Sequence, residues 1–256
     1  MLIKHIIIII LGLALLACNT AGTSTNNNIR PSQSTNDVAL SNLDLGMAYM
    51  KQGSFEKALE KLNRAKEADP NYSSTYNVLG LLYETLGENI KAEENFTKAI
   101  RLNSNDSKTL NNYGLFLCNQ GRKDEAETVF AKAANNPLYE SPELAIANAG
   151  VCFYNNNEIP KAEDYFRRAL KLNSKLPSAL LLMAEITFRQ QDAINARGYL
   201  QRYQEVSSHT AKSLWLGIQI EQQLDNKNAV SSYSLLLKNK FPDSVEAARL
   251  REAGIR

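Results

Sequence analysis

Few side chains in this 256-residue chain could act as nucleophiles, general bases or metal ligands. It has two histidines, His5 and His209, and we expect His5 to leave with an N-terminal signal. His209 stands between Ser208 and Thr210 in a predicted connection, where a histidine is ordinarily a solvated loop residue. The sequence has no HExxH or CxxC metal or redox motif and no phosphate-binding glycine loop. It therefore predicts no enzyme activity, metal, cofactor or small-molecule substrate.

Charge also excludes a class of partner. The chain has 29 Lys and Arg residues against 27 Asp and Glu residues, which gives a formal net charge of +2. Binding to nucleic acid relies on a strongly basic face that releases counterions from the phosphates. We therefore expect no nucleic-acid partner, and we interpret the Glu and Lys residues as solvated helix faces.

The N-terminus has the features of an export signal. Lys4 and His5 precede an apolar run of 11 residues, from Ile6 to Leu16. The run is shorter than the roughly 20 residues that span a bilayer, but its length is typical of a secretory signal. It ends in Leu-Leu-Ala before Cys18, which resembles the bacterial lipoprotein signal. The resemblance implies a diacylglycerol on the thiol of Cys18 and cleavage before it; the alternative is an uncleaved membrane anchor.

The residues after Cys18 suggest where the lipid places the chain. Asn19 stands where an Asp would resemble the inner-membrane retention signal, so we expect the periplasmic face of the outer membrane of a Gram-negative bacterium. Acyl chains anchor a terminus with about 0.8 kcal/mol per buried methylene. We predict a signal peptide at 1–17 and a lipidated, flexible linker at 18–36, because that segment is too polar to fold.

Glycines recur along the chain at a fixed spacing. Gly46, Gly80 and Gly114 are 34 residues apart, and Gly150 follows after 36. The same small and apolar positions surround each glycine, and two weaker copies follow. In the second copy the frame reads Leu79-Gly80-x-x-Tyr83, then Ala92, Phe96 and Ala99. This frame resembles the tetratricopeptide repeat (TPR), a pair of helices of about 34 residues.

The resemblance implies an all-α fold. We expect a right-handed superhelical TPR solenoid of about six helix-turn-helix repeats at 37–242, with a C-terminal capping helix at 243–256. The Gly and Ala positions are small because the two helices of a repeat cross there. The expected repeats are approximately 39–72, 73–106, 107–142, 143–176, 177–209 and 210–242. Residues suited to the turns are Gly53, Gly87, Gly121, Asn157, Asp192 and Asp225.

Two further cysteines lie one repeat apart. Cys118 and Cys152 are separated by 34 residues, so both fall on first helices of adjacent repeats. The oxidising periplasm favours a disulfide that links the third repeat to the fourth. Two buried free thiols are the alternative, because cysteines whose Cα atoms lie more than about 7 Å apart cannot pair.

The TPR resemblance also implies a partner-binding groove lined by the first helix of each repeat. The first repeat supplies Leu40, Leu43, Met47, Met50 and Lys51; the second supplies Ser74, Asn77, Leu81, Glu84 and Thr85; the third supplies Lys108, Asn111, Leu115, Cys118 and Asn119. In the first repeat this lining is apolar, which favours a contact site, unless the linker or a terminal helix covers it. Leu43 and Met47 occupy the places of the Lys and Asn that grip a terminal carboxylate in chaperone-binding TPR clamps. An apolar or helical partner segment is therefore expected.

The layout of lipoprotein signal, polar linker and six repeats resembles the PilW/PilF family of type IV pilus biogenesis lipoproteins. The run NNYGLFLCNQGR at 111–122 is similar to the third repeat of that family. The resemblance implies a pilotin or stabiliser that helps the secretin PilQ to reach, or multimerise in, the outer membrane. Two alternatives are a periplasmic TPR adaptor similar to NlpI or BamD, which recruits envelope enzymes or barrel-assembly components, and an enzyme whose site the sequence does not display.

Overall fold

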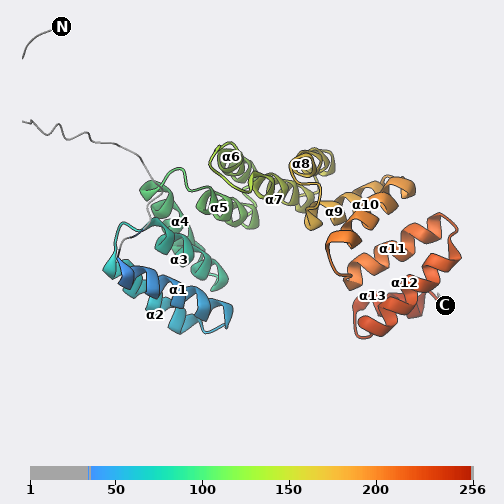
Figure 1. The fold of residues 1–256 in the computed structure, drawn as a ribbon, viewed down its shortest axis with the longest axis horizontal. Helices are drawn as coiled ribbons and strands as arrows, with labels where there is room; N and C mark the ends of the chain where they lie inside the picture. Colours follow the sequence, from blue (N-terminus) through green and yellow to red (C-terminus); the bar gives the residue numbers. More distant parts are fainter. Residues whose placement is uncertain (1–33, 35, 255–256) are drawn as a thin grey trace, which may run out of the picture. The chain divides into compact units, whose positions relative to one another are not determined.

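The computed structural model describes Ser34 and residues 36–254, and within them every regular element is a helix (Figure 1). The predicted signal peptide and Cys18 lie outside the described residues. The helices are α1 (Asp37–Lys51), α2 (Phe55–Ala68), α3 (Ser73–Thr85), α4 (Asn89–Leu102), α5 (Ser107–Asn119), α6 (Lys123–Ala134), α7 (Pro142–Asn155), α8 (Ile159–Leu172), α9 (Pro177–Arg189), α10 (Ala193–Val206), α11 (Ala211–Gln223), α12 (Lys227–Lys240) and α13 (Val245–Glu252). The prediction of an all-α TPR solenoid with a C-terminal capping helix is confirmed.

The helices pack as consecutive pairs. Each odd-numbered helix from α1 to α11 packs against the helix that follows it, and the second helix of every pair contacts the first helix of the next. First helices also contact one another directly, as α1 does with α3, α3 with α5 and α5 with α7. One side of the solenoid is therefore formed by first helices, which is the arrangement that the repeat pattern implied.

The recurring glycines allow the two helices of a pair to approach closely. A Cβ atom on Gly80 would lie 2.8 Å from the ring of Phe96, and one on Gly114 would lie 2.6 Å from the ring of Phe130. Real Cβ atoms essentially never come within 3.0 Å of such neighbours. Both phenylalanines are buried, so the missing side chain lets the core ring fill the crossing.

Backbone with positive φ separates the two helices of every pair. Glycine occupies this position in the first three pairs and Asn157, Gln191 and Asp225 in the last three, with φ values of 61°, 66° and 52° for the non-glycine residues. Asp192, which the sequence analysis placed at this turn, caps the following helix, because its carboxylate accepts a hydrogen bond from the Asn195 amide at 3.1 Å. Its neighbour Gln191 takes the left-handed conformation.

The chain just before α1 is fastened to the end of α2. The Asn36 side chain caps α1 by accepting from the Val38 amide at 3.0 Å, and its Nδ2 donates to the Ala68 carbonyl at 2.8 Å. The buried Ser34 hydroxyl donates to the Asp69 carboxylate at 2.6 Å. Ser34 and Asn36 therefore belong to the fold, and the prediction of a flexible linker up to residue 36 was wrong for them, since both side chains find partners on α2.

The last helix closes the C-terminal end of the solenoid. Ala247 and Leu250 of α13 are fully buried and share a cluster with Leu214, Ile218 and Leu237 of α11 and α12. The sixth pair thereby buries an apolar side that has no seventh pair to cover it.

Candidate functional site

The predicted groove residues lie on α1, α3 and α5. These helices are successive neighbours, and we call the side of the solenoid that they form with α7, α9 and α11 the first-helix face. In TPR solenoids this side offers an extended surface to partners. The apolar residues expected there differ in how much of each side chain is exposed.

On α1, Met47 is the most accessible of the predicted apolar residues. Its side chain is 42% exposed, whereas Leu40 and Met50 are partly buried and pack against the cluster beneath them. Leu43 is only 5% exposed and belongs to that cluster together with Leu62. The prediction that Leu43 lines an open groove was therefore wrong.

The position of Leu43 follows from the periodicity of α1. Ala39, Leu43 and Gly46 are the buried residues of the helix, at the i, i+4, i+7 spacing of a single stripe. This stripe faces the neighbouring helices of the core, so Leu43 cannot reach a partner.

On α3 and α5, asparagine side chains join neighbouring first helices. Asn112 Nδ2 donates to Asn77 Oδ1 at 3.1 Å. One repeat further along, Asn148 Nδ2 donates to Asn111 Oδ1 at 2.9 Å. The predicted groove residues Asn77 and Asn111 thus already have hydrogen-bond partners within the protein.

The two predicted leucines of these helices, Leu81 and Leu115, are partly buried and pack against the apolar cluster of the second to fourth pairs. They present only part of their surface on the first-helix face.

The structure joins Cys118 and Cys152 by a disulfide between α5 and α7. Their Cα atoms lie 5.7 Å apart, within the range that a disulfide spans. Cys152 is 1% exposed, and Cys118 is partly exposed on the first-helix face. Next to it, Asn119 Nδ2 donates to Glu84 Oε1 at 2.9 Å, so α3, α5 and α7 are linked in sequence. The oxidised state of the two thiols in solution stays a prediction.

Further along, the first helices carry a charged cluster that the sequence analysis did not identify. The carboxylate of Glu185 on α9 pairs with Arg189 at 2.6 Å and with Lys212 of α11 at 2.8 Å. Burial favours its neutral form, but hydrogen bonding from Lys212 lowers the pKa of Glu185 below its usual value. Burial and the Glu185 carboxylate together raise the pKa of Tyr154. In this part of the structure an ion pair between Glu185 and Lys212 joins the first helices α9 and α11.

Second helices use glutamates in a similar way. Glu93 accepts from the Tyr113 hydroxyl at 3.0 Å, and Glu127 accepts from the Tyr165 hydroxyl, each across to the next pair. Burial, followed by these hydrogen bonds, raises the pKa of both tyrosines to about 12. Glu163 accepts from Gln190 at 2.8 Å in the same manner. The signal was present in the sequence, since the three glutamates recur after 34 and 36 residues.

Within the described residues, no group of three or more His, Cys, Asp or Glu side chains could hold a metal ion. His209 is the histidine of this part, and its Nδ1 is buried without a hydrogen-bond partner. None of the described helices combines the length and the apolar character needed to cross a membrane.

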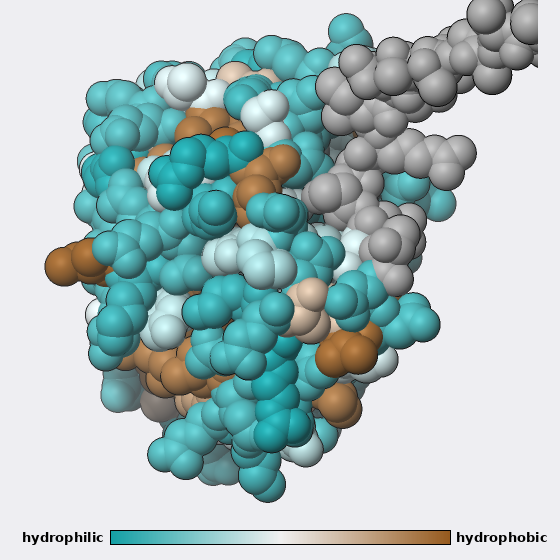
Figure 2. All heavy atoms as spheres, turned by 90° about the vertical axis from the view of Figure 1, so that its left-hand side faces the viewer, coloured by the Kyte–Doolittle hydropathy of each residue, from teal (hydrophilic) through white to brown (hydrophobic). Residues whose placement is uncertain are grey.

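The surface at the N-terminal end of the solenoid is mostly hydrophilic, with separate hydrophobic areas (Figure 2). The large apolar residues exposed in the first two helix pairs are Val38, Leu45, Met47, Leu86 and Ile90. A partner at this end would therefore meet isolated apolar side chains within polar surroundings, and not a continuous apolar groove.

Comparison with known proteins places the chain among TPR proteins. Models described as tetratricopeptide repeat match residues 37–105, 95–128 and 149–209. The type IV pilus assembly protein PilF of Pseudomonas aeruginosa is 28% identical over 246 residues, which cover 96% of this chain and 97% of PilF.

Solved structures give the same relatives. The structure of Pseudomonas aeruginosa PilF matches with a TM-score of 0.75 and 29% identity, over 85% of this chain and 98% of that one. PilW, described as a widely conserved type IV pilus biogenesis factor, matches with a TM-score of 0.73 and 30% identity, over 84% of this chain and 99% of PilW. A TPR protein of Parabacteroides merdae has a TM-score of 0.60 at 17% identity and shares the fold alone.

Proposed function

Because the chain belongs to the PilF/PilW family of tetratricopeptide-repeat proteins, we propose that it is a type IV pilus biogenesis factor that acts by binding other proteins. Its specific role in this proposal is that of a pilotin: an outer-membrane lipoprotein, anchored through Cys18, that supports the localisation, multimerisation or stability of the secretin PilQ. Binding takes place on the first-helix face.

The extent of the similarity to PilF carries this proposal. It covers 96% of the chain and nearly the whole of PilF, so it includes all six helix pairs and not a generic repeat alone. The Parabacteroides merdae protein, in contrast, has the same fold at only 17% sequence identity. A shared partner is expected where identity extends along the entire scaffold, because each helix pair contributes to one surface.

The exposed part of the first-helix face supports a protein ligand. Met47 is exposed next to the partly buried Leu40 and Met50, and flexible methionines adapt to irregular apolar surfaces. A partner segment that sets one apolar side chain against Met47 and polar groups around it would fit this surface.

The test is an assay of heat-resistant PilQ multimers in outer membranes from a deletion strain. The strain is complemented with wild type, Met47→Glu or Leu45→Glu. Leu45 is 46% exposed, close to the 42% of Met47, but it lies two residues away, about 200° around the helix. A substitution at Leu43 is unsuitable, since a charge at that buried position would unfold the first pair.

We expect the deletion to remove PilQ multimers, and wild type and Leu45→Glu to restore them. Met47→Glu should fail while keeping the helical circular dichroism of the wild type. If PilQ is unaffected by the deletion, the protein is another envelope TPR adaptor, and co-purified envelope enzymes or barrel-assembly components would identify it. If Met47→Glu restores multimers fully, PilQ assembly does not use this side of α1.

A further inference from the structure

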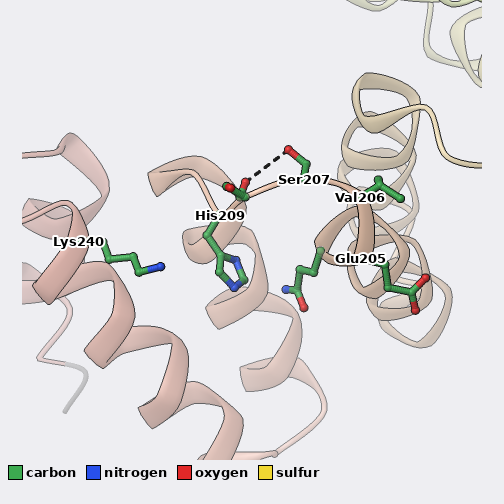
Figure 3. Close-up of a pocket in the computed structure, with 7 residues that line it drawn as sticks. Glu205, Val206, Ser207, His209 and Lys240 are labelled. Carbon is green, nitrogen blue, oxygen red and sulfur yellow. Dashed lines mark hydrogen bonds between the residues drawn. The ribbon is translucent and has the colours of Figure 1, made fainter.

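A hollow of about 460 Å³ lies between the connection from α10 to α11 and the end of α12 (Figure 3). It is lined by Gln204, Ser207, Ser208, His209 and Lys240, with Glu205 and Val206 at its border. Val206 packs against the apolar cluster beneath α10, whereas the polar residues of the lining belong to none of the apolar clusters, and Met47 lies at the opposite end of the chain of helix pairs. The hollow is therefore separate from the surface proposed to act in pilus biogenesis.

The lining has one basic and one acidic side chain, and of these two Lys240 points toward His209 (Figure 3). Lys240 is exposed, extends toward His209, and forms no ion pair with any described residue (Figure 3). Glu205, the acidic residue of the lining, directs its carboxylate away from both of them (Figure 3). Burial, followed by the charge of Lys240, lowers the pKa of His209, so the imidazole is neutral at pH 7. A bound anion would compensate the charge of Lys240.

The imidazole of His209 is held in place with one nitrogen left to donate. Its ring packs edge-on against Tyr233 of α12, with centroids 6.3 Å apart. A proton on the buried Nδ1 would have no acceptor, so the tautomer that carries its proton on Nε2 is favoured. The Tyr203 hydroxyl donates to the Ser208 carbonyl at 3.1 Å, and Gln204 donates to the Tyr233 hydroxyl at 2.9 Å. These bonds fix the connection that carries the histidine.

We propose that the hollow binds a carboxylate group of a protein segment, paired with Lys240 and hydrogen-bonded by the imidazole of His209. An ammonium group and nearby neutral donors are the ligands that a carboxylate prefers. Because Lys240 is exposed, the contact is sensitive to salt and suits a reversible interaction.

The histidine itself reports on binding. The imidazole signals of the ¹⁵N-labelled full chain are followed by NMR, with His209→Gln used to separate them from the signals of His5. Two probes carry the carboxylate at different places: acetyl-Gly-Gly at a chain end and acetyl-Glu-amide on a side chain. Acetyl-Gly-Gly-amide and sodium chloride at matched ionic strength control for the peptide and for screening.

We expect saturable shifts of His209 and a rise in its pKa with one or both carboxylate probes, and neither effect with the amide or chloride. Lys240→Gln should weaken binding about tenfold, since it removes a charged hydrogen bond. Lys227→Gln, which removes an exposed charge from the other end of α12, should bind as the wild type does. Equal shifts with chloride, or undiminished binding by Lys240→Gln, would overturn the carboxylate site whatever the outcome of the PilQ assay.

Discussion

In the three N-terminal helix pairs a glycine occupies the turn between the helices, whereas in the three C-terminal pairs Asn157, Gln191 and Asp225 do. All six residues have positive φ, so the turn has the left-handed backbone conformation in both halves. Glycine meets it without steric cost, while other L-residues pay about 1 kcal/mol or more for the left-handed conformation.

At one of these turns the side chain forms a hydrogen bond to the next helix pair. Gln191 Oε1 accepts a hydrogen bond from Gln223 Nε2 at 3.1 Å, which links the fifth pair to the sixth. A glycine could not form this link. The repeat therefore fixes the backbone conformation of the turn residue, whereas the side chain of that residue is free to bond to the next helix pair or not.

The largest effect is expected where the two halves meet. The disulfide between Cys118 and Cys152 joins the third pair to the fourth, so reduction should lower the free energy of unfolding by about 2–4 kcal/mol. Urea denaturation of a Cys18→Ser chain, with and without reductant, measures this loss. The same chain carrying Cys118→Ala and Cys152→Ala should not respond to reductant. Two free thiols in the unreduced, denatured Cys18→Ser chain would refute the disulfide.

Helix crossings provide the next contrast. Gly114→Ala should destabilise the protein by about 1–3 kcal/mol, because the new Cβ would lie 2.6 Å from the ring of Phe130. Gly198→Ala, within α10, meets no atom within 4 Å and should stabilise the protein by about 0.5–1 kcal/mol. Thermal unfolding of Gly114→Ala and Gly198→Ala tests these two expectations. A neutral Gly114→Ala would show that Phe130 yields to the methyl group.

Exchanging turn residues tests the comparison of the two halves directly. Gly121→Ala should cost about 1 kcal/mol, since alanine would take a φ of 76°. Gln191→Gly should gain about 0.5 kcal/mol, because relief of the backbone exceeds the loss of one exposed hydrogen bond. The urea denaturation midpoints of the two variants, compared with that of the wild type, measure both changes in stability. A destabilised Gln191→Gly would mean that the bond to Gln223 outweighs the backbone.

The smallest expected effect is on the loss of stability at acidic pH. The pKa of Glu185 is lower in the folded chain than in the unfolded one, so its contribution to stability is present above pH 4.5 and is lost as the pH falls through the folded value. Glu185→Gln should flatten the fall of melting temperature between pH 5 and pH 3. The asparagine pairs Asn77–Asn112 and Asn111–Asn148 do not titrate, so Asn77→Ala should leave the pH profile unchanged in shape.

The sequence predicted the helix crossings because Gly80 and Gly114 recur with their aromatic partners one helix later. It was wrong about Leu43, since a repeat position gives the average direction of a side chain and not how far the next pair covers it. The linker prediction included Ser34 and Asn36 because the polar residues that cap helices are also common in polar tails. The Glu185 cluster was missed because its partners come from different repeat positions, so no period marks it.

The bonds that fasten Ser34 and Asn36 to the end of α2 also determine the reach of the molecule. If Cys18 carries the lipid, the tether is the segment from residue 18 to residue 34, because the chain beyond it is part of the first pair. A fully extended segment of this length spans at most about 55 Å. With that anchor, the first pair would be confined to a shell of that depth beneath the membrane surface, where the local concentration of any membrane-embedded partner would be high.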